Sequence, residues 1–312
     1  MPGRPDIGVI VVTHASRRHL DRCLPPLLEA PERPRVLVVN SSSGDGTVER
    51  ARALGAETWL VPRQSFNHGA TREQARRLLG TPVVVMLTPD AYPAGPSELG
   101  RLVHPVRTGQ AACAYGRQLP HEGADAVEAF GRAFSYPGQS ELRSARDQAR
   151  LGSGVHFCSN AWAAWSSAAL DRIGGFQPTL VSEETIAVAR LLQAGERVAY
   201  VADAVVRHSH RYGPVQEFRR HFDIGWTRAH HAALLLASGG DQARGRRFAR
   251  LLLRDLAARA PARLPGVLVA LAAKWLGYRA GMLGAHLPNP LAAILSGQDF
   301  FWRSDFAPGR QP

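Results

Sequence analysis

The chain has 312 residues, of which 45% are hydrophobic and 21% charged, so it is long enough for one large or two medium globular domains. Its formal net charge of +12 predicts an anionic partner such as nucleic acid, an acidic membrane surface or a phosphorylated substrate. The cysteines lack the spacing of a metal site and predict free thiols in a reducing compartment: Cys23, Cys113 and Cys158.

Neither end of the chain predicts a membrane-crossing segment. The N-terminal residues lead directly into a β-rich run, without the apolar segment of a signal peptide. The longest apolar run near the C-terminus covers residues 267–273, which is too short to span a bilayer. We therefore expect a cytoplasmic protein, either free or attached peripherally to the inner face of the cell membrane.

Over the first 110 residues, apolar runs alternate with segments of helical periodicity. Strands are predicted at 7–13, 35–40, 57–61 and 83–87, and helices at 18–29, 47–54, 70–79 and 97–107. Pro25-Pro26 is expected to kink or delay the first helix, and Thr47 to cap the second. The alternation predicts an α/β fold with a mostly parallel sheet covered on both faces.

Polar side chains follow three of these strands at their predicted carboxyl ends, at Thr13, Asn40 and Asp90. Ligands of open α/β sheets bind in the crevice at that edge. Asp90 comes directly after Pro89, so it is either an ordinary turn residue or a carboxylate of a metal or phosphate site. The convergence of the three side chains on one edge favours the site.

The chain is less regular between residues 111 and 213. A helix is predicted to open at Glu183-Glu184, where two carboxylates also suit the helix dipole, so a structural role is the alternative to a functional one. The histidines His208 and His210 follow a strand. The other segments are a strand at 111–116, a polar and irregular stretch at 118–148, an apolar and aromatic segment at 155–165 and the strand at 198–206.

From about residue 214 the pattern is helical throughout. The segment 244–259 places Phe248, Leu251 and Leu252 at helical spacing and carries several arginines on its flanks. Such a helix can lie on an anionic membrane surface, or it can pack on the main domain and expose its basic face to water. Nucleic-acid binding is not expected, because the basic residues are not interleaved with aromatic residues in a recognisable module.

A series of short motifs runs along the chain from near residue 7 to beyond residue 300. The motifs are Val11-Val-Thr13, Asn40-Ser-Ser-Ser-Gly-Asp-Gly-Thr47, Phe66-Asn-His-Gly69 with Thr71-Arg72, Leu87-Thr-Pro-Asp-Ala91, Phe134-Ser-Tyr-Pro137, Ser159-Asn160, Gly174-Gly-Phe176, Ser182-Glu-Glu184, His208-Ser-His210, Phe222-Asp-Ile-Gly225 and Lys274-Trp-Leu-Gly-Tyr278. In combination and in this order, they resemble bacterial family 2 glycosyltransferases, and most closely the branch of rhamnosyltransferases that build cell-surface polysaccharides.

The resemblance implies a Rossmann-like nucleotide-diphospho-sugar transferase fold and a metal-dependent transfer that inverts the anomeric carbon. Asp90 matches the metal-binding carboxylate, and His208 matches a histidine that completes the site, with His210 the weaker candidate of the two. A Mg²⁺ or Mn²⁺ ion at this position would offset the charge that develops on the donor diphosphate.

Further residues match by the same resemblance. Thr13 and Asn40 match positions that line the nucleobase pocket, and Arg72 matches an arginine near the diphosphate. Glu184 of the pair Glu183-Glu184 matches the catalytic base, which takes the proton from the acceptor hydroxyl. The family usually has Asp at the positions of Asn40 and Glu184.

The resemblance therefore predicts transfer of L-rhamnose from dTDP-rhamnose to a saccharide or polyprenyl-linked acceptor. Residues 1–213 would form the glycosyltransferase domain, with the donor held by 1–110 and the acceptor and base by 111–213. The helical region 214–312 would dock to the sheet, to an anionic membrane surface, or to both. Two alternatives are a nucleotide-sugar-binding protein with impaired catalysis and a membrane-surface scaffold of a polysaccharide assembly complex.

Overall fold

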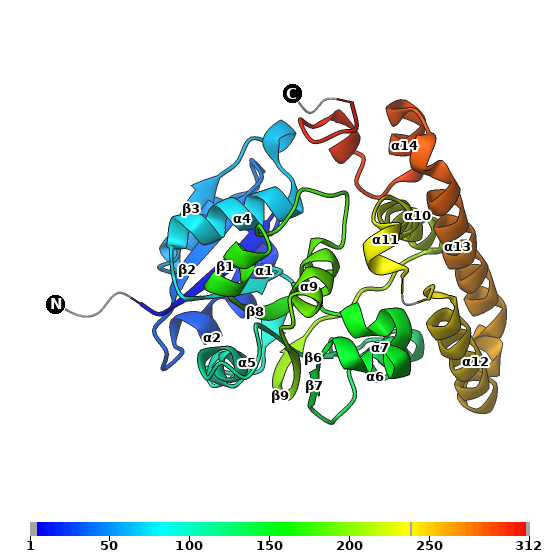
Figure 1. Ribbon diagram of the computed structural model, residues 1–312, viewed down its shortest axis with the longest axis horizontal. Coiled ribbons are helices and arrows are strands. Elements are labelled where there is room, and N and C mark those ends of the chain that lie inside the picture. Colours follow the sequence, from blue (N-terminus) through cyan, green and yellow to red (C-terminus); the bar gives the residue numbers. More distant parts are fainter. Residues whose placement is uncertain (1–4, 238, 310–312) are drawn as a thin grey trace.

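The computed structural model describes residues 5–237 and 239–309. These residues form a nine-stranded sheet flanked by helices, with the C-terminal helices gathered on one side of the molecule (Figure 1). In order across the sheet, the strands are β3 (Glu57–Leu60), β2 (Arg35–Asn40), β1 (Ile7–Thr13), β4 (Val83–Leu87), β8 (Trp162–Ser166), β6 (Cys113–Leu119), β9 (Val198–Arg207) and β5 (Tyr92–Pro93), and β7 (Glu141–Arg143) pairs with β9.

The sheet is mostly parallel, as the alternation of strands and helices predicts. The neighbours β3, β2, β1 and β4 run parallel to one another. β8 is antiparallel to both β4 and β6, so β6 and its parallel neighbour β9 point the same way as β1. The short strands β5 and β7 are antiparallel to β9. The carboxyl ends of β1, β2, β4 and β9 therefore meet at one edge.

The central strand β1 is buried along its whole length, and its alternate side chains enter two separate cores. Val9 and Val11 pack in one core, whereas Ile10 and Val12 pack in the other. Helices α1 (Arg17–Cys23), α2 (Pro25–Leu28), α3 (Thr47–Ala53) and α5 (Glu98–Arg107) contribute to the first core, and α4 (His68–Leu79), α8 (Ser167–Arg172) and α9 (Glu183–Gln193) to the second.

Local details refine the sequence-based expectations. The interruption expected at Pro25 divides the first helix into α1 and α2, because proline fits the first turn of a helix but not its interior. Thr47 is the first residue of α3 and not its cap, which is Gly46 in a left-handed conformation with φ of +80°. The stretch 118–148 was expected to be irregular, but it contains the helix α6 (Ala126–Ser135). A capping box formed by Asp125 and Glu128 stabilises the N-terminus of this helix. The stretch also contains β7 and leads into α7 (Gln148–Leu151).

The C-terminal region is helical, as expected. Its two long helices α10 and α13 approach closely, because glycines lie where they cross. A Cβ atom at Gly281 would lie 2.1 Å from the carbonyl oxygen of Phe222, and Gly225 and Gly277 are similarly enclosed. The helices are α10 (Pro214–His230), α11 (Ala232–Leu235), α12 (Gln242–Arg259), α13 (Leu264–Leu283) and α14 (Asn289–Leu295).

The apolar face of the basic helix α12 packs inside the protein. Leu252 and Leu256 are buried in a cluster that includes Val267 of α13 and Phe130 of α6. Several arginines along α12, such as Arg250, remain exposed. The helix thus packs on its neighbours with a solvated basic face, which was one of the two expectations for it. Among the described residues, no helix combines the length and apolar character needed to cross a bilayer.

Candidate active site

One acidic and two imidazole side chains meet at the carboxyl edge of the sheet. β5 pairs with the end of β9, with Tyr92 opposite Arg207, and this pairing brings Asp90 beside His208 and His210. The Asp90 carboxylate lies 3.6 Å from His208 Nε2 and 3.4 Å from His210 Nε2. Candidate ligand atoms of the three side chains all lie within 4.8 Å of one another, as a shared metal ion requires.

Neighbouring residues orient His208 toward this cluster. Its Nδ1 lies 2.8 Å from Oε1 of Gln118, which also accepts a hydrogen bond from Arg132. Because that oxygen can only accept, Nδ1 carries the proton and Nε2 presents its lone pair to Asp90 and His210. Nε2 is buried and has no hydrogen-bond partner among residues 5–237 and 239–309, so the residues present fit a bound cation.

The electrostatics of the cluster also suit metal binding. Burial opposes ionisation of Asp90, but the adjacent imidazoles of His208 and His210 hold its pKa well below the usual value. Burial, reinforced by His208, lowers the pKa of His210 to about 4, so this ring is neutral at pH 7. A carboxylate and two imidazoles are a ligand set that divalent transition metals accept. His210 stands beside Asp90 as closely as His208 does, although the sequence favoured His208.

A second feature of this half of the protein is the start of helix α9. Glu183 is buried, and its carboxylate pairs with Arg72 of α4 and accepts a 3.0 Å hydrogen bond from Asn160. Burial opposes ionisation of Glu183, but Arg72 lowers its pKa below the usual value. Ser182, immediately before the helix, has a left-handed φ of +66°, a strained conformation that is common at functional sites.

Glu184 has a different environment from its neighbour. Its side chain is not fixed by an ion pair among the described residues, and it is partly exposed. Burial, together with the negative charge of Glu183, raises the pKa of Glu184 to about 8. Two adjacent carboxylates whose pKa values move in opposite directions are a pattern typical of acid–base sites.

Arg72 faces Glu183 rather than open solvent. It is buried, and its Nε has no hydrogen-bond partner among the described residues. Its predicted role near a diphosphate stays a prediction. Asn160, whose amide links Glu183 to the indole of Trp165 at 3.0 Å, was not predicted as a site residue, although it lies within one of the sequence motifs.

Thr13 and Asn40 lie side by side in register on β1 and β2. The Asn40 amide donates to Oγ of Ser43 at 2.9 Å and to Oγ1 of Thr13 at 3.2 Å, and it accepts from the Ser43 amide at 2.8 Å. Both side chains are buried, so they hold the turn after β2 together. Their predicted place in a nucleobase pocket stays a prediction.

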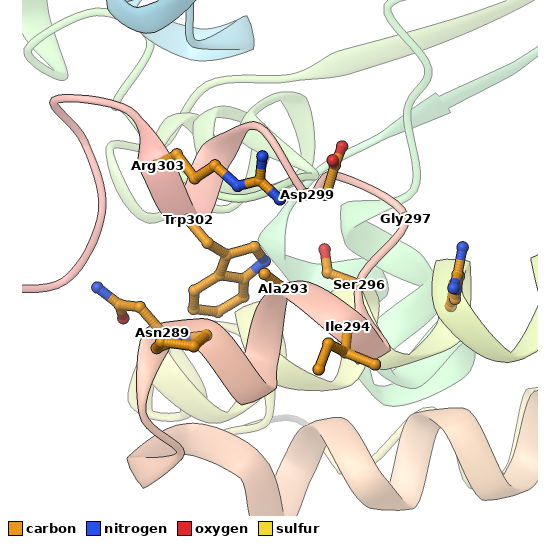
Figure 2. A pocket seen from close by; sticks show the side chains of 10 residues that line it. Asn289, Ala293, Ile294, Ser296, Gly297, Asp299, Trp302 and Arg303 are labelled. Atoms are coloured by element: carbon orange, nitrogen blue, oxygen red, sulfur yellow. The ribbon is translucent and has the colours of Figure 1, made fainter.

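A cavity in the C-terminal region is separate from these residues. Its volume is about 690 Å³, and α14 and the turns after it form much of its wall (Figure 2). Trp302 and Arg303 come from the last turns, and Asn289 and Ile294 from α14. None of the site residues predicted from the sequence lines it.

Comparisons with known proteins identify relatives over most of the chain. The chain is 34% identical over 273 residues to the O-antigen chain rhamnosyltransferase RfbN of Salmonella typhimurium, covering 86% of this chain and 87% of that one. It is 33% identical over 272 residues to the O-antigen chain rhamnosyltransferase WbaN of Salmonella anatum, covering 86% of each.

Solved structures share the fold at low sequence identity. The mannosyltransferase PcManGT of Pyrobaculum calidifontis, solved with GDP-Man and Mn²⁺, matches with a TM-score of 0.58 and 19% identity, covering 93% of this chain and 88% of that one. S. aureus TarS 1–349 in complex with UDP-GlcNAc matches with a TM-score of 0.53 and 14% identity, covering 95% and 89%. The family model described as glycosyltransferase like family 2 matches residues 5–223. The family model and the two relatives establish that the chain belongs to glycosyltransferase family 2.

Proposed function

We propose that this chain is a divalent-metal-dependent, inverting rhamnosyltransferase that acts in the synthesis of a cell-surface polysaccharide. The cluster of Asp90, His208 and His210 at the carboxyl edge of the sheet carries the proposal, because it suits a cation beside a donor diphosphate. The names of the two Salmonella relatives support L-rhamnose as the transferred sugar, and we propose dTDP-rhamnose as its donor.

Asp90, His208 and His210 would hold the metal ion. A bound divalent cation would neutralise charge on the donor diphosphate and on the leaving nucleotide. Of the two expected ions, we propose Mn²⁺, because two imidazole nitrogens suit it better than Mg²⁺, which prefers oxygen ligands. Gln118 keeps His208 in the tautomer that presents Nε2 to the site.

Glu184 would be the base that accepts the proton of the acceptor hydroxyl as its oxygen attacks the anomeric carbon. Its raised pKa suits this task, because a base titrating near the working pH accepts a proton more readily than an ordinary carboxylate does. Glu183 would act as a positioning residue, since its bonds to Arg72 and Asn160 hold the first turn of α9 in place.

The remaining parts of the chain would serve the two substrates. We assign residues 1–110 to the donor, with Thr13 and Asn40 near the base and Arg72 on the diphosphate side. Residues 111–213 would serve the acceptor, a saccharide or a polyprenyl-linked saccharide, and 214–312 would form the helical region that packs beside them.

We further propose that this helical region rests on an anionic membrane surface. Residues 242–295 contain nine Lys and Arg residues and one acidic residue, Asp255. The neighbouring helices α13 and α14 expose large apolar side chains, which suit the interface of a bilayer. These residues are Leu268, Val269, Trp275, Leu276, Leu283, Leu291 and Ile294.

Co-sedimentation with vesicles tests the membrane proposal. The chain should sediment with vesicles of phosphatidylglycerol and not with those of phosphatidylcholine. Leu276→Asp should reduce this binding, whereas Leu78→Asp, at an exposed leucine of α4, should not. Equal sedimentation with both kinds of vesicle would contradict the proposal.

Thermal shifts with nucleotide sugars test the catalytic proposal. The wild-type chain should be stabilised by dTDP-rhamnose in the presence of Mn²⁺ more than by other nucleotide sugars. Asp90→Asn should abolish the part of the shift that depends on Mn²⁺. Asp203→Asn provides a matched control, because Asp203 is exposed on β9 and lies outside the cluster. A metal-dependent shift that survives Asp90→Asn would overturn the assignment.

A further inference from the structure

A second cavity lies next to helix α9, between the main sheet domain and the C-terminal helices. It has a volume of about 820 Å³. Its walls come from α6, from the segment after α7, and from α10, α12 and α13, which Figure 1 shows gathered on one side of the molecule. This space is large enough for a sizeable organic ligand. None of the site residues predicted from the sequence lines it.

Part of the wall is aromatic or aliphatic. The rings of Phe134 and Phe248 stand edge to face at 5.2 Å, and Trp275 of α13 lies at the outer side, where its side chain is 64% exposed. Phe157, Tyr278, Leu271 and Ile224 complete the apolar lining. Such a wall suits an aliphatic chain or the apolar face of a sugar ring.

The charged part of the wall is strongly basic. It contains one carboxylate, that of Asp241, and five cations. The cations are Arg228, Arg244, Arg246, Lys274 and Arg279. Two of the cations are paired, Arg228 with Asp241 at 2.9 Å and Lys274 with Glu217 at 3.1 Å. The excess of positive charge indicates an anionic ligand.

Arg244 is the cation best placed for such a ligand. Its guanidinium lies 4.6 Å from the ring centre of Phe157 and 5.6 Å from that of Phe134, so aromatic rings hold it in the wall. Among residues 5–237 and 239–309, no carboxylate lies within the 4 Å of an ion pair with Arg244. Nearby, Nη1 of Arg228 is buried without a hydrogen-bond partner in the same part of the chain. Planar guanidinium groups of this kind bind phosphate oxygens well.

The cavity also adjoins the candidate base. Thr185 lines its wall and directly follows Glu184 in the first turn of α9. Arg228 is close enough to Glu184 to favour its ionised form. A ligand held in the cavity therefore lies beside the first turn of α9, which carries the carboxylate that would accept the proton.

From these observations we propose that the cavity binds the anionic, lipid-like end of the acceptor. The ligand would carry a phosphate or diphosphate ester joined to an apolar chain, with the ester at Arg244 and Arg228 and the chain against the aromatic wall near Trp275. This inference rests on the proposed glycosyl transfer, because it assigns the acceptor of that reaction to a defined place in the structure.

Calorimetry with farnesyl diphosphate, a short probe of this chemistry, tests the proposal on the full chain. The probe should bind the wild type, and Arg244→Gln should weaken binding by about tenfold to a hundredfold, the loss expected when a hydrogen bond to a charged group disappears. Arg250→Gln is the matched control, because it removes an exposed charge from α12 outside the cavity. Arg279→Gln, at an exposed lining position, is a second test that does not disturb the ring contacts of Arg244.

The comparison ligands separate the sources of affinity. Farnesol bound as tightly as farnesyl diphosphate would overturn the anion site, and inorganic pyrophosphate bound as tightly would overturn the amphiphilic ligand. An equal loss in Arg250→Gln and Arg244→Gln would reduce the effect to general electrostatics and would also overturn the proposal. Donor hydrolysis should be measurable in the wild type and should persist in the control Arg250→Gln. Its absence from the wild type would count against the proposed transferase alone, since binding of the probe does not depend on it.

Discussion

The neighbouring carboxylates of Glu183 and Glu184 predict a specific pH dependence of catalysis. With a pKa of about 8 for Glu184, only about a tenth of the molecules carry the ionised base at pH 7. Because the base must be ionised to accept a proton, kcat/KM should rise with pH through neutrality and level off above the pKa of Glu184.

Glu183→Gln is expected to move this acid limb to lower pH. The substitution removes one negative charge and keeps an oxygen that can accept from Asn160. Two like charges roughly 7 Å apart, in an effective dielectric of about 20, repel by about 2 kcal/mol, which corresponds to about 1.5 pKa units. Arg72 would lose its ion-pair partner, and its positive charge would then also lower the pKa of Glu184 by favouring the ionised form. We therefore expect a shift of about one to two pH units.

The assay is the initial rate of nucleoside diphosphate release from the donor with Mn²⁺, followed across the neutral pH range. Glu196→Gln is a control that neutralises a carboxylate beyond the far end of α9. Glu184→Gln should reduce turnover by at least about a hundredfold, as expected for loss of a general base. An acid limb that stays in place in Glu183→Gln, or wild-type turnover in Glu184→Gln, would refute the reasoning.

Two predictions concern stability. Gly281→Ala should lower the free energy of unfolding by about 1–3 kcal/mol, because its Cβ would lie 2.1 Å from a backbone oxygen of α10. Gly266→Ala, at an open position of the same helix, should not lower the melting temperature, and equal losses in both variants would contradict the packing argument. Asp223 accepts hydrogen bonds from Ser296 and Gly297, but burial raises its pKa to about 7. A raised folded-state pKa contributes stability that is present below about pH 4 and is lost as the pH rises through about 7. Melting temperatures of Asp223→Asn should therefore fall less than those of the wild type between these pH values, and parallel profiles would count against this linkage.

The fold could be predicted because its signals are local. The all-apolar segment 83–87 and the alternation of strands with helices indicate a doubly covered parallel sheet, and strands β1 to β4 follow that pattern, whereas β8 runs antiparallel to β4. The position of Asp90 after a strand was enough to place it at the ligand-binding edge. Helix α6 was missed because the stretch 118–148 is polar overall, although its capping box and the helical spacing of Val127, Phe130 and Phe134 mark a helix there.

The amino-acid sequence by itself determined the fold class, the edge of the sheet at which the candidate site lies and the family that the motifs resemble. Only the tertiary structure decided which groups meet. It placed His210 beside Asp90 through the pairing of β5 with β9, turned Arg72 toward Glu183, and left Glu184 with a raised pKa. The physical reason is that burial and the distance between charges depend on segments far apart in the chain. The periodicity of strands and helices, in contrast, depends only on residues that are close in the sequence.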